Sequence, residues 1–155
     1  KFSTKFENEL KKKIGNRKLI TTNEFSKSVE LVLKSMDIKP GDEILTTPLA
    51  CLATNMPILN CSAIPVWYDI NPKNGNPDLN HLKKKVSKKT KAIFIYHWCG
   101  NPIDLNSIYK FANKYSLKVV EDASESFGSK YKNKYTKWRY WFRNNVYIKW
   151  SSCFS

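Results

Sequence analysis

The chain has 155 residues, of which 41% are hydrophobic and 14% aromatic, and a formal net charge of +14 at pH 7. This length and composition allow one domain with a hydrophobic core and exclude a disordered tail. There is neither an apolar run of about 20 residues nor a signal-like start, so we expect a cytoplasmic protein without a membrane partner. The four cysteines lie far apart and there are two histidines, which favours reduced thiols over a zinc site or a disulfide scaffold.

The first forty residues contain two helical patterns. A lysine run, Lys11 to Lys13, indicates a solvated helix face. From Ser26 to Met36 apolar residues recur at helical spacing, and Pro40 and Gly41 then mark a turn. The N-terminus of this second helix would offer backbone N–H groups and hydroxyls to an anion.

Strands and helices alternate over the next eighty residues. The expected strands are residues 44–46, 63–68, 92–96 and 118–120, and the expected helices between them are residues 51–60, 78–86 and 104–114. We expect an early end or a kink at Pro57. Because this alternation favours right-handed βαβ crossovers, the predicted fold class is α/β, a parallel-rich sheet with helices on both faces.

Three of the predicted strands lead into a side chain that could take part in chemistry, namely Asp69, His97 and Asp122. In open α/β sheets ligands bind at the carboxyl ends of the strands. An acid at that place can meet a cationic ring nitrogen, as an Asp does in enzymes that use pyridoxal phosphate (PLP). The alternative is that Glu121 and Asp122 cap a following helix, and this segment alone slightly favours capping.

The basic charge is concentrated at the end of the chain. Residues 130–155 contain no acid and carry half of the net charge, on Lys130, Lys132, Lys134, Lys137, Arg139, Arg143 and Lys149. Much of the remaining excess fits the residue usage of an A/T-rich gene. Without a reader motif, nucleic-acid binding is a minor alternative.

An ordered series of motifs resembles a known family. The motifs are P-G-D-E-I at 40–44, C-L-A-T-N at 51–55, A-I-P-V-W-Y-D-I at 63–70, T-K-A-I at 90–93, H-W-C-G-N-P-I-D-L at 97–105 and V-V-E-D-A at 119–123. They resemble the DegT/DnrJ family of PLP-dependent aminotransferases of fold type I, which act on nucleotide-linked keto sugars. The resemblance covers residues 20–134 and implies part of the large domain of that fold, PLP as cofactor, an amino donor such as glutamate, and a homodimer.

The resemblance also implies roles for three residues. Asp122 would pair with the pyridine nitrogen of the cofactor. Glu125 would lie near its phenolic oxygen, where the family usually has Gln or His, and a second carboxylate there would be repulsive. Ser26 would contact the phosphate in a turn where Glu24 and Phe25 replace the family's Asn and Gly and would reduce cofactor affinity.

Two further family features have no counterpart in the sequence. The family often places an aromatic residue near Leu49 to Cys51 for packing on the cofactor ring, and Trp98 is the open alternative here. The family's Schiff-base lysine lies in a downstream segment that the sequence does not contain. We therefore expect a truncated aminotransferase that is inactive as given. The alternatives are a non-catalytic cofactor-binding or subunit-pairing relic and a basic nucleic-acid-binding protein.

The last segment departs from the family. We predict an incomplete aminotransferase large domain over residues 1–134 and an aberrant aromatic and basic tail over residues 135–155. If Arg139 has the codon AGA, a reading frame shifted by one nucleotide turns residues 137–141 into a sequence with Gly-Asp, then Ile or Thr, then Gly, and the family carries Gly-Asp-Ile-Gly at about this place. A frameshift is therefore our hypothesis for the tail. Nucleotide sequencing tests it, and a different codon at Arg139 would refute it.

Overall fold

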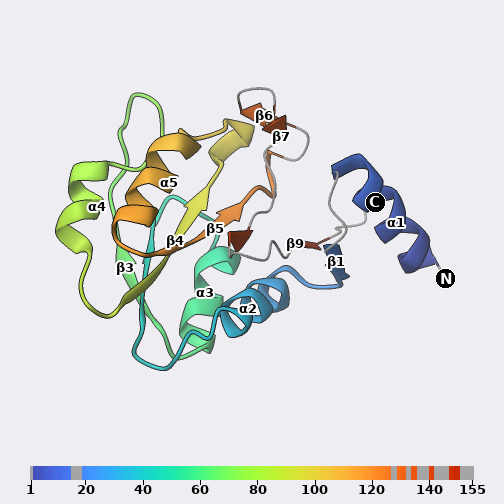
Figure 1. Ribbon diagram of the computed structural model, residues 1–155, viewed down its shortest axis with the longest axis horizontal. Helices are drawn as coiled ribbons and strands as arrows, with labels where there is room; N and C mark the ends of the chain where they lie inside the picture. Colours follow the sequence, from blue (N-terminus) through green and yellow to red (C-terminus); the bar gives the residue numbers. More distant parts are fainter. Residues whose placement is uncertain are drawn as a thin grey trace.

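The computed structural model describes residues 2–14, 19–126, 129–131, 134–135, 140–141 and 147–150 (Figure 1). The helices are α1 (Phe2–Ile14), α2 (Phe25–Ser35), α3 (Leu52–Asn60), α4 (Leu79–Lys85) and α5 (Leu105–Lys114), with a 3-10 turn, η1 (Trp98–Gly100). The strands are β1 (Leu19–Thr22), β2 (Glu43–Thr46), β3 (Ile64–Trp67), β4 (Thr90–Tyr96), β5 (Lys118–Asp122), β6 (Lys130–Tyr131), β7 (Lys134–Tyr135), β8 (Tyr140–Trp141) and β9 (Tyr147–Trp150).

The main sheet has the strand order β3-β2-β4-β5-β8. Strands β2 to β5 are parallel to one another, and β8 pairs antiparallel with β5. The register of β4 against β5 runs from Ala92 opposite Lys118 to Tyr96 opposite Asp122. The carboxyl ends of β4 and β5 therefore lie side by side at one edge of the sheet, which we call the carboxyl edge.

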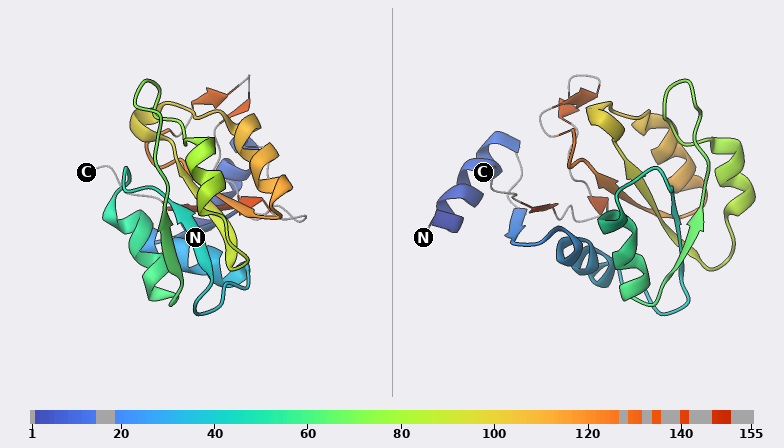
Figure 2. Two further views of the ribbon diagram at one scale, coloured as in Figure 1. Left: turned by 90° about the vertical axis from the view of Figure 1, so that its left-hand side faces the viewer. Right: turned by 180° about the vertical axis from the view of Figure 1, so that it is seen from behind.

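Helices cover both faces of this sheet, because successive strand residues point to opposite faces. On one face Ile44, Phe94 and Val120 pack in a core cluster with residues of α2 and α3. On the other face Leu45, Ile95 and Val119 pack in a second cluster with residues of α4 and α5. Figure 2 shows the two helix pairs on opposite sides of the strands. The predicted fold class is thus confirmed.

The caps of two helices follow from the sequence. Asp78 is the N-cap of α4 and accepts hydrogen bonds from the backbone N–H groups of Asn80 at 2.8 Å and His81 at 3.2 Å. Asp104 is the N-cap of α5 and accepts one from the N–H of Ser107 at 3.3 Å. Each cap satisfies donors that the first helical turn leaves without a partner.

The structure corrects three expectations. Helix α3 continues through the buried Pro57 to Asn60, so the predicted early end is wrong. Proline has no backbone N–H, so the helix lacks one donor at this position. The carbonyl of Pro57 still accepts a hydrogen bond from the N–H of Cys61. Leu19 begins a strand, β1, which the sequence did not predict. Asp122 is the last residue of β5 and residues 123–126 form no helix, so capping does not explain the acid.

Strands near the end of the chain take part in the five-stranded sheet and in both two-stranded sheets. Besides the pairing of β8 with β5, β9 pairs in parallel with β1, and β6 forms a hairpin with β7. The division at residues 134 and 135 stays a prediction, and residues 136–139, 142–146 and 151–155 lie outside the described residues. Within the described part, none of the helices is long and apolar enough to cross a membrane.

Candidate active site

Buried polar side chains gather at the carboxyl edge. Asp122 ends β5 and is 3% exposed. Its Oδ2 atom accepts a hydrogen bond of 2.8 Å from the hydroxyl of Thr54. Its Oδ1 atom accepts two from Ser124, one of 3.0 Å from the N–H and one of 2.7 Å from the hydroxyl. The carboxylate is therefore fixed in orientation from two sides.

Electrostatics make this acid costly to ionise. Burial raises the pKa of Asp122, while the hydrogen bonds from Ser124 and Thr54 and the nearby His97 lower it. The hydrogen-bond donors named above are all neutral groups. A cation placed against the carboxylate would offset the cost of burying its charge.

Thr54 reaches Asp122 because α3 is tied to the end of β2. Asn55 is buried, its Oδ1 accepts a hydrogen bond of 2.6 Å from the Thr46 hydroxyl, and its Nδ2 donates one of 3.1 Å to the Thr47 carbonyl. These bonds fix the first turns of α3 against the sheet. Thr54 therefore meets a residue 68 positions later in the chain.

Glu125 lies on the same edge, but its carboxylate faces the turn after β4. Its Oε2 atom accepts a hydrogen bond of 2.8 Å from the N–H of Cys99. Burial and the nearby carboxylate of Glu125 both raise the pKa of Tyr96, the residue opposite Asp122 in the register. Cys99 has φ 51°, so this bond holds a left-handed turn in place.

Gly100 completes that turn and gives a stability prediction. Its φ is +76°, and a Cβ atom there would lie 3.1 Å from the backbone carbonyl oxygen of Glu125. We expect Gly100→Ala to destabilise the fold by about 1–3 kcal/mol, because it combines a left-handed backbone with a close backbone contact. Urea unfolding measures this. Gly75→Ala is the control, because Gly75 also has positive φ (+69°) but nothing within 4 Å of its Cβ position, and it should cost less.

A second buried carboxylate, that of Glu121, lies on the opposite side of β5 from Asp122. Its Oε1 atom accepts a hydrogen bond from the Tyr109 hydroxyl, and its Oε2 atom lies 3.4 Å from Nε2 of His97. The Nδ1 atom of His97 accepts a hydrogen bond of 3.3 Å from the N–H of Ile103. Since Nδ1 is an acceptor, Nε2 carries the proton and donates it to Glu121. His97 thus anchors the segment after β4 and does not point at Asp122 as a ligand would.

Ser26 lies in the first turn of α2, as predicted. The C-terminal end of this helix is near the amino end of β5, because Lys118 Nζ donates a hydrogen bond to the carbonyl of Met36. The N-terminal end of α2 therefore points toward the carboxyl edge. Glu24 is its N-cap and makes no side-chain capping bond. Phe25, in the family's glycine position, packs against the core cluster under α2.

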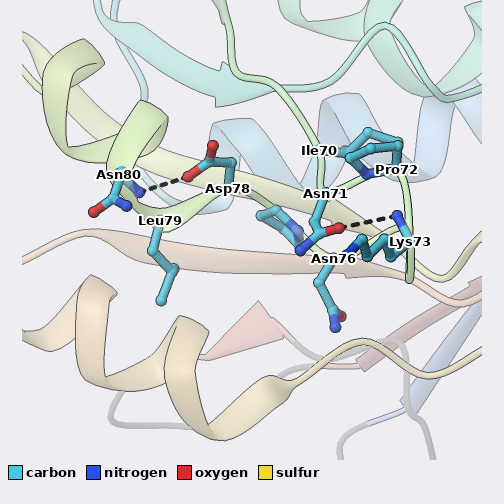
Figure 3. Close-up of a pocket in the computed structure, with 9 residues that line it drawn as sticks. Ile70, Asn71, Pro72, Lys73, Asn76, Asp78, Leu79 and Asn80 are labelled. Atoms are coloured by element: carbon cyan, nitrogen blue, oxygen red, sulfur yellow. Dashed lines mark hydrogen bonds between the residues drawn. The ribbon is translucent and has the colours of Figure 1, made fainter.

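Asp69 does not join the site. It is exposed, its Oδ1 atom accepts a hydrogen bond of 2.8 Å from the N–H of Ile70, and its own N–H donates one of 2.9 Å to Nδ1 of His81. It opens the loop in Figure 3, where the dashed bonds run from Lys73 N–H to Asn71 and from Asn80 N–H to Asp78. The hydrogen bonds of Asp69 are all made with residues of this loop and the following helix, so Asp69 has a structural role.

Trp98 lies beside the loop that was expected to carry an aromatic residue. Its side chain is 43% exposed, and with Leu49 and Lys73 it lines a hollow of about 470 Å³. Its ring meets that of Tyr96 edge to face, with centroids 5.8 Å apart. In the described residues, no group of three His, Cys, Asp or Glu side chains could hold a metal ion.

The parallel-rich sheet, its two helix layers and a buried acid at the carboxyl edge define the class of protein: an α/β protein with a candidate ligand site at the strand ends. More particularly, the chain belongs to the DegT/DnrJ/EryC1/StrS aminotransferase family, whose model matches residues 1–137. The predicted family is thus confirmed.

Three similar proteins illustrate this membership. UDP-2-acetamido-2-deoxy-3-oxo-D-glucuronate aminotransferase of Pseudomonas aeruginosa is 32% identical over 131 residues, which are 84% of this chain and 36% of that protein. The aminotransferase of Psychrobacter cryohalolentis superposes with a TM-score of 0.82 at 28% identity, over 87% of this chain and 34% of that chain. NtdA of Bacillus subtilis, solved with bound cofactor PMP, superposes with a TM-score of 0.77 at 27% identity, over 83% and 29%. The chain thus spans about a third of the length of these relatives.

Proposed function

We propose that this chain forms the cofactor-side part of a PLP-dependent aminotransferase that transfers an amino group from a donor such as glutamate to a nucleotide-linked keto sugar, and that it works as a homodimer. Membership of the family supports the reaction, and the name of the Pseudomonas relative supports a nucleotide-linked oxo sugar as substrate. The observation that carries the proposal is the buried carboxylate of Asp122 at the carboxyl end of β5.

Asp122 fits the part of the cofactor that needs an anion. When bound, PLP supplies an electron sink, and a protonated ring nitrogen strengthens it. Asp122 would keep that proton on the nitrogen. Thr54 and Ser124 hold its two oxygens in place, so no reorganisation of the carboxylate is needed.

Ser26 and the start of α2 would hold the phosphate. The first turn of a helix presents N–H groups and the positive end of the helix dipole, both of which favour an anion. Ser26 would add its hydroxyl. Glu24 opposes this by placing like charge nearby, so we expect weak phosphate binding that improves in Glu24→Gln.

Titration with pyridoxamine 5′-phosphate (PMP) tests the role of Asp122 directly, because this form needs no lysine to bind. Hydrogen bonds to charged groups contribute about 1.5–3 kcal/mol, so we expect Asp122→Asn to weaken PMP binding by about tenfold or more. Isothermal titration calorimetry measures the dissociation constant of PMP for the wild type and for the variant. The control is Asp69→Asn, which makes the same charge change at an exposed site and should bind as the wild type does. Equal affinity in Asp122→Asn and wild type would overturn the assignment.

A further inference from the structure

The hollow beside Trp98 lies where three loops meet at the carboxyl edge. Leu49 follows β2, and Ile70 and Lys73 belong to the loop after β3. Trp98 and Ile103 belong to the segment after β4. Its volume of about 470 Å³ falls within the usual range for a small-ligand site, and ligands of open α/β sheets bind at this edge. The hollow therefore has the place and the size of a binding site.

Hydrogen bonds fix the two longer walls of the hollow. Asn76, near the end of the loop after β3, accepts a hydrogen bond of 2.9 Å through its Oδ1 atom from the N–H of Asp104, in the segment after β4. Within the loop, Oδ1 of Asn71 accepts one of 2.9 Å from Lys73 N–H, which Figure 3 shows. The carbonyl of Asn71 accepts another of 2.8 Å from Gly75 N–H. A ligand would therefore meet a hollow that is already formed.

The lining combines apolar side chains with one positive charge. Ile103 is 4% exposed, and Ile70 and Leu49 are half-buried. Lys73 is exposed, and among the described residues that line the hollow it is the one basic side chain, with no acidic one beside it. Glu125 does not line the hollow. The lining therefore favours an anion over a cation.

Trp98 offers the hollow a flat aromatic surface. Its side chain is 43% exposed, and its contact with Tyr96 is edge to face, with an angle of 62° between the ring planes. This contact holds the tryptophan ring in place and leaves part of it accessible to a ligand. Nucleic-acid bases stack on such side chains whatever their sequence, because every base has a π-face. The hollow thus suits a planar ring that carries negative charge.

We propose that the hollow binds the nucleotide end of the sugar substrate, with the base against Trp98 and the phosphates near Lys73. This assignment names the part of the substrate that the hollow recognises, and it rests on the function proposed above. The hollow lies next to the acid assigned to the cofactor, because Tyr96, which packs on Trp98, is opposite Asp122 in the register of β4 and β5. A nucleotide held there would bring its sugar to the carboxyl edge.

NMR titration of the ¹⁵N-labelled, cofactor-free chain with UDP, the nucleotide in the name of the Pseudomonas relative, tests the stacking. We expect Trp98→Ala to weaken UDP binding by about fivefold or more, the usual contribution of one base stacked on an aromatic side chain. Trp98→Phe keeps a flat ring and should retain most of the affinity. Trp67→Ala is the matched control, because Trp67 is 45% exposed at the end of β3 and does not line the hollow.

Lys73→Gln tests the contact with the phosphates. We expect it to weaken UDP binding by about threefold at low ionic strength, and the difference from the wild type should shrink as salt screens the exposed charges. Lys88→Gln is the control, since it makes the same charge change at an exposed position outside the hollow. Uridine and pyrophosphate should each bind more weakly than UDP, because each carries only one of the two recognised groups.

Equal affinity for UDP in the wild type, Trp98→Ala and Lys73→Gln would overturn the proposal, and so would an absence of UDP binding. Pyrophosphate that binds as tightly as UDP would overturn it as well, because the base would then contribute nothing. If Trp98→Ala weakened PMP binding as much as UDP binding, the hollow would belong to the cofactor instead. UDP binding is measured without cofactor, so failure of PMP binding and failure of the nucleotide site are separate results. The backbone signals of residues far from the hollow report whether each variant is folded.

Discussion

Asp122→Asn is expected to make the cofactor-free chain more stable, although the same substitution should weaken PMP binding. The asparagine has the shape of the aspartate and removes a buried charge whose donors are neutral hydroxyl and amide groups. Its oxygen can accept from Ser124, and its amide can donate to the oxygen of Thr54. We expect a gain of about 1 kcal/mol, the usual size for a stabilising substitution.

The pH dependence of this gain has a definite sign. Because burial raises the pKa of Asp122 above its ordinary value of 3.8, the folded chain binds more protons at this site than the unfolded chain over the interval between the two values. Stability from this site is therefore present at low pH and is lost as pH rises through the folded-state pKa. The asparagine side chain of the variant does not titrate, so the difference between variant and wild type should grow over the same interval and then stay constant.

Urea unfolding at several pH values measures both effects. The control is again Asp69→Asn, which makes the same charge change at an exposed site and should leave the stability close to that of the wild type. A loss of stability in Asp122→Asn that grows as pH rises would contradict the expectation. That result would mean that Asp122 already has a favourable cationic partner in the cofactor-free fold.

This opposition between stability and binding is typical of a functional site. The chain keeps a carboxylate at a place where a neutral residue would fold better. Thr54 and Ser124 lower the cost without removing it. A buried anion in that state gains most when a cation binds to it, which is why we propose that Asp122 pairs with a protonated ring nitrogen.

The order of elements could be predicted because each is encoded locally. Asp78 and Asp104 cap the helices that follow them, and short continuous apolar runs mark strands with two buried faces. β1 was not predicted because its apolar pattern consists of two residues, Leu19 and Ile20. Its pairing partner, β9, begins far along the chain at Tyr147. A strand of four residues depends on such distant pairing, which local patterns do not contain.

The site could be predicted only in part, for the same reason. Asp122 was identified because it ends a strand and fits a family motif. Its partner Thr54 was not, because the 68 positions that separate them leave no spacing to detect. Glu125 was expected near the phenolic oxygen of the cofactor, and its observed bond to the Cys99 N–H depends on a left-handed turn that no sequence pattern predicts.

Glu121→Ala is expected to have the largest effect on stability, a loss of about 3–5 kcal/mol from the combined terms of lost hydrogen bonds and an empty cavity. Glu121 is 1% exposed and His97 is fully buried. Removal of the carboxylate takes the acceptor from the buried His97 Nε2–H and one acceptor from the part-buried Tyr109 hydroxyl, and a buried donor that loses its acceptor costs about 1–3 kcal/mol. The cavity left by the side chain adds to this.

Glu121→Gln separates the charge from the hydrogen bonds. Glutamine fills the same volume, but its amide nitrogen cannot accept, so only one of the two donors keeps an acceptor. We expect a loss between that of Glu121→Ala and zero. Urea unfolding of the wild type and both variants at one pH measures the three free energies of unfolding and so gives their order. A loss below about 1 kcal/mol in Glu121→Ala would contradict the buried network.

The consequence of losing Glu121 should extend to the turn after β4. His97 fixes Ile103 through Nδ1, and the turn between them carries the Cys99 N–H that holds Glu125. When Glu121 no longer orients His97, this turn loses one of its anchors, and Glu125 loses a fixed donor. Glu121→Ala should therefore also broaden the NMR signals of Cys99 and Glu125, whereas Glu43→Ala, which removes an acid bonded to Ser87 at the opposite edge, should leave them sharp.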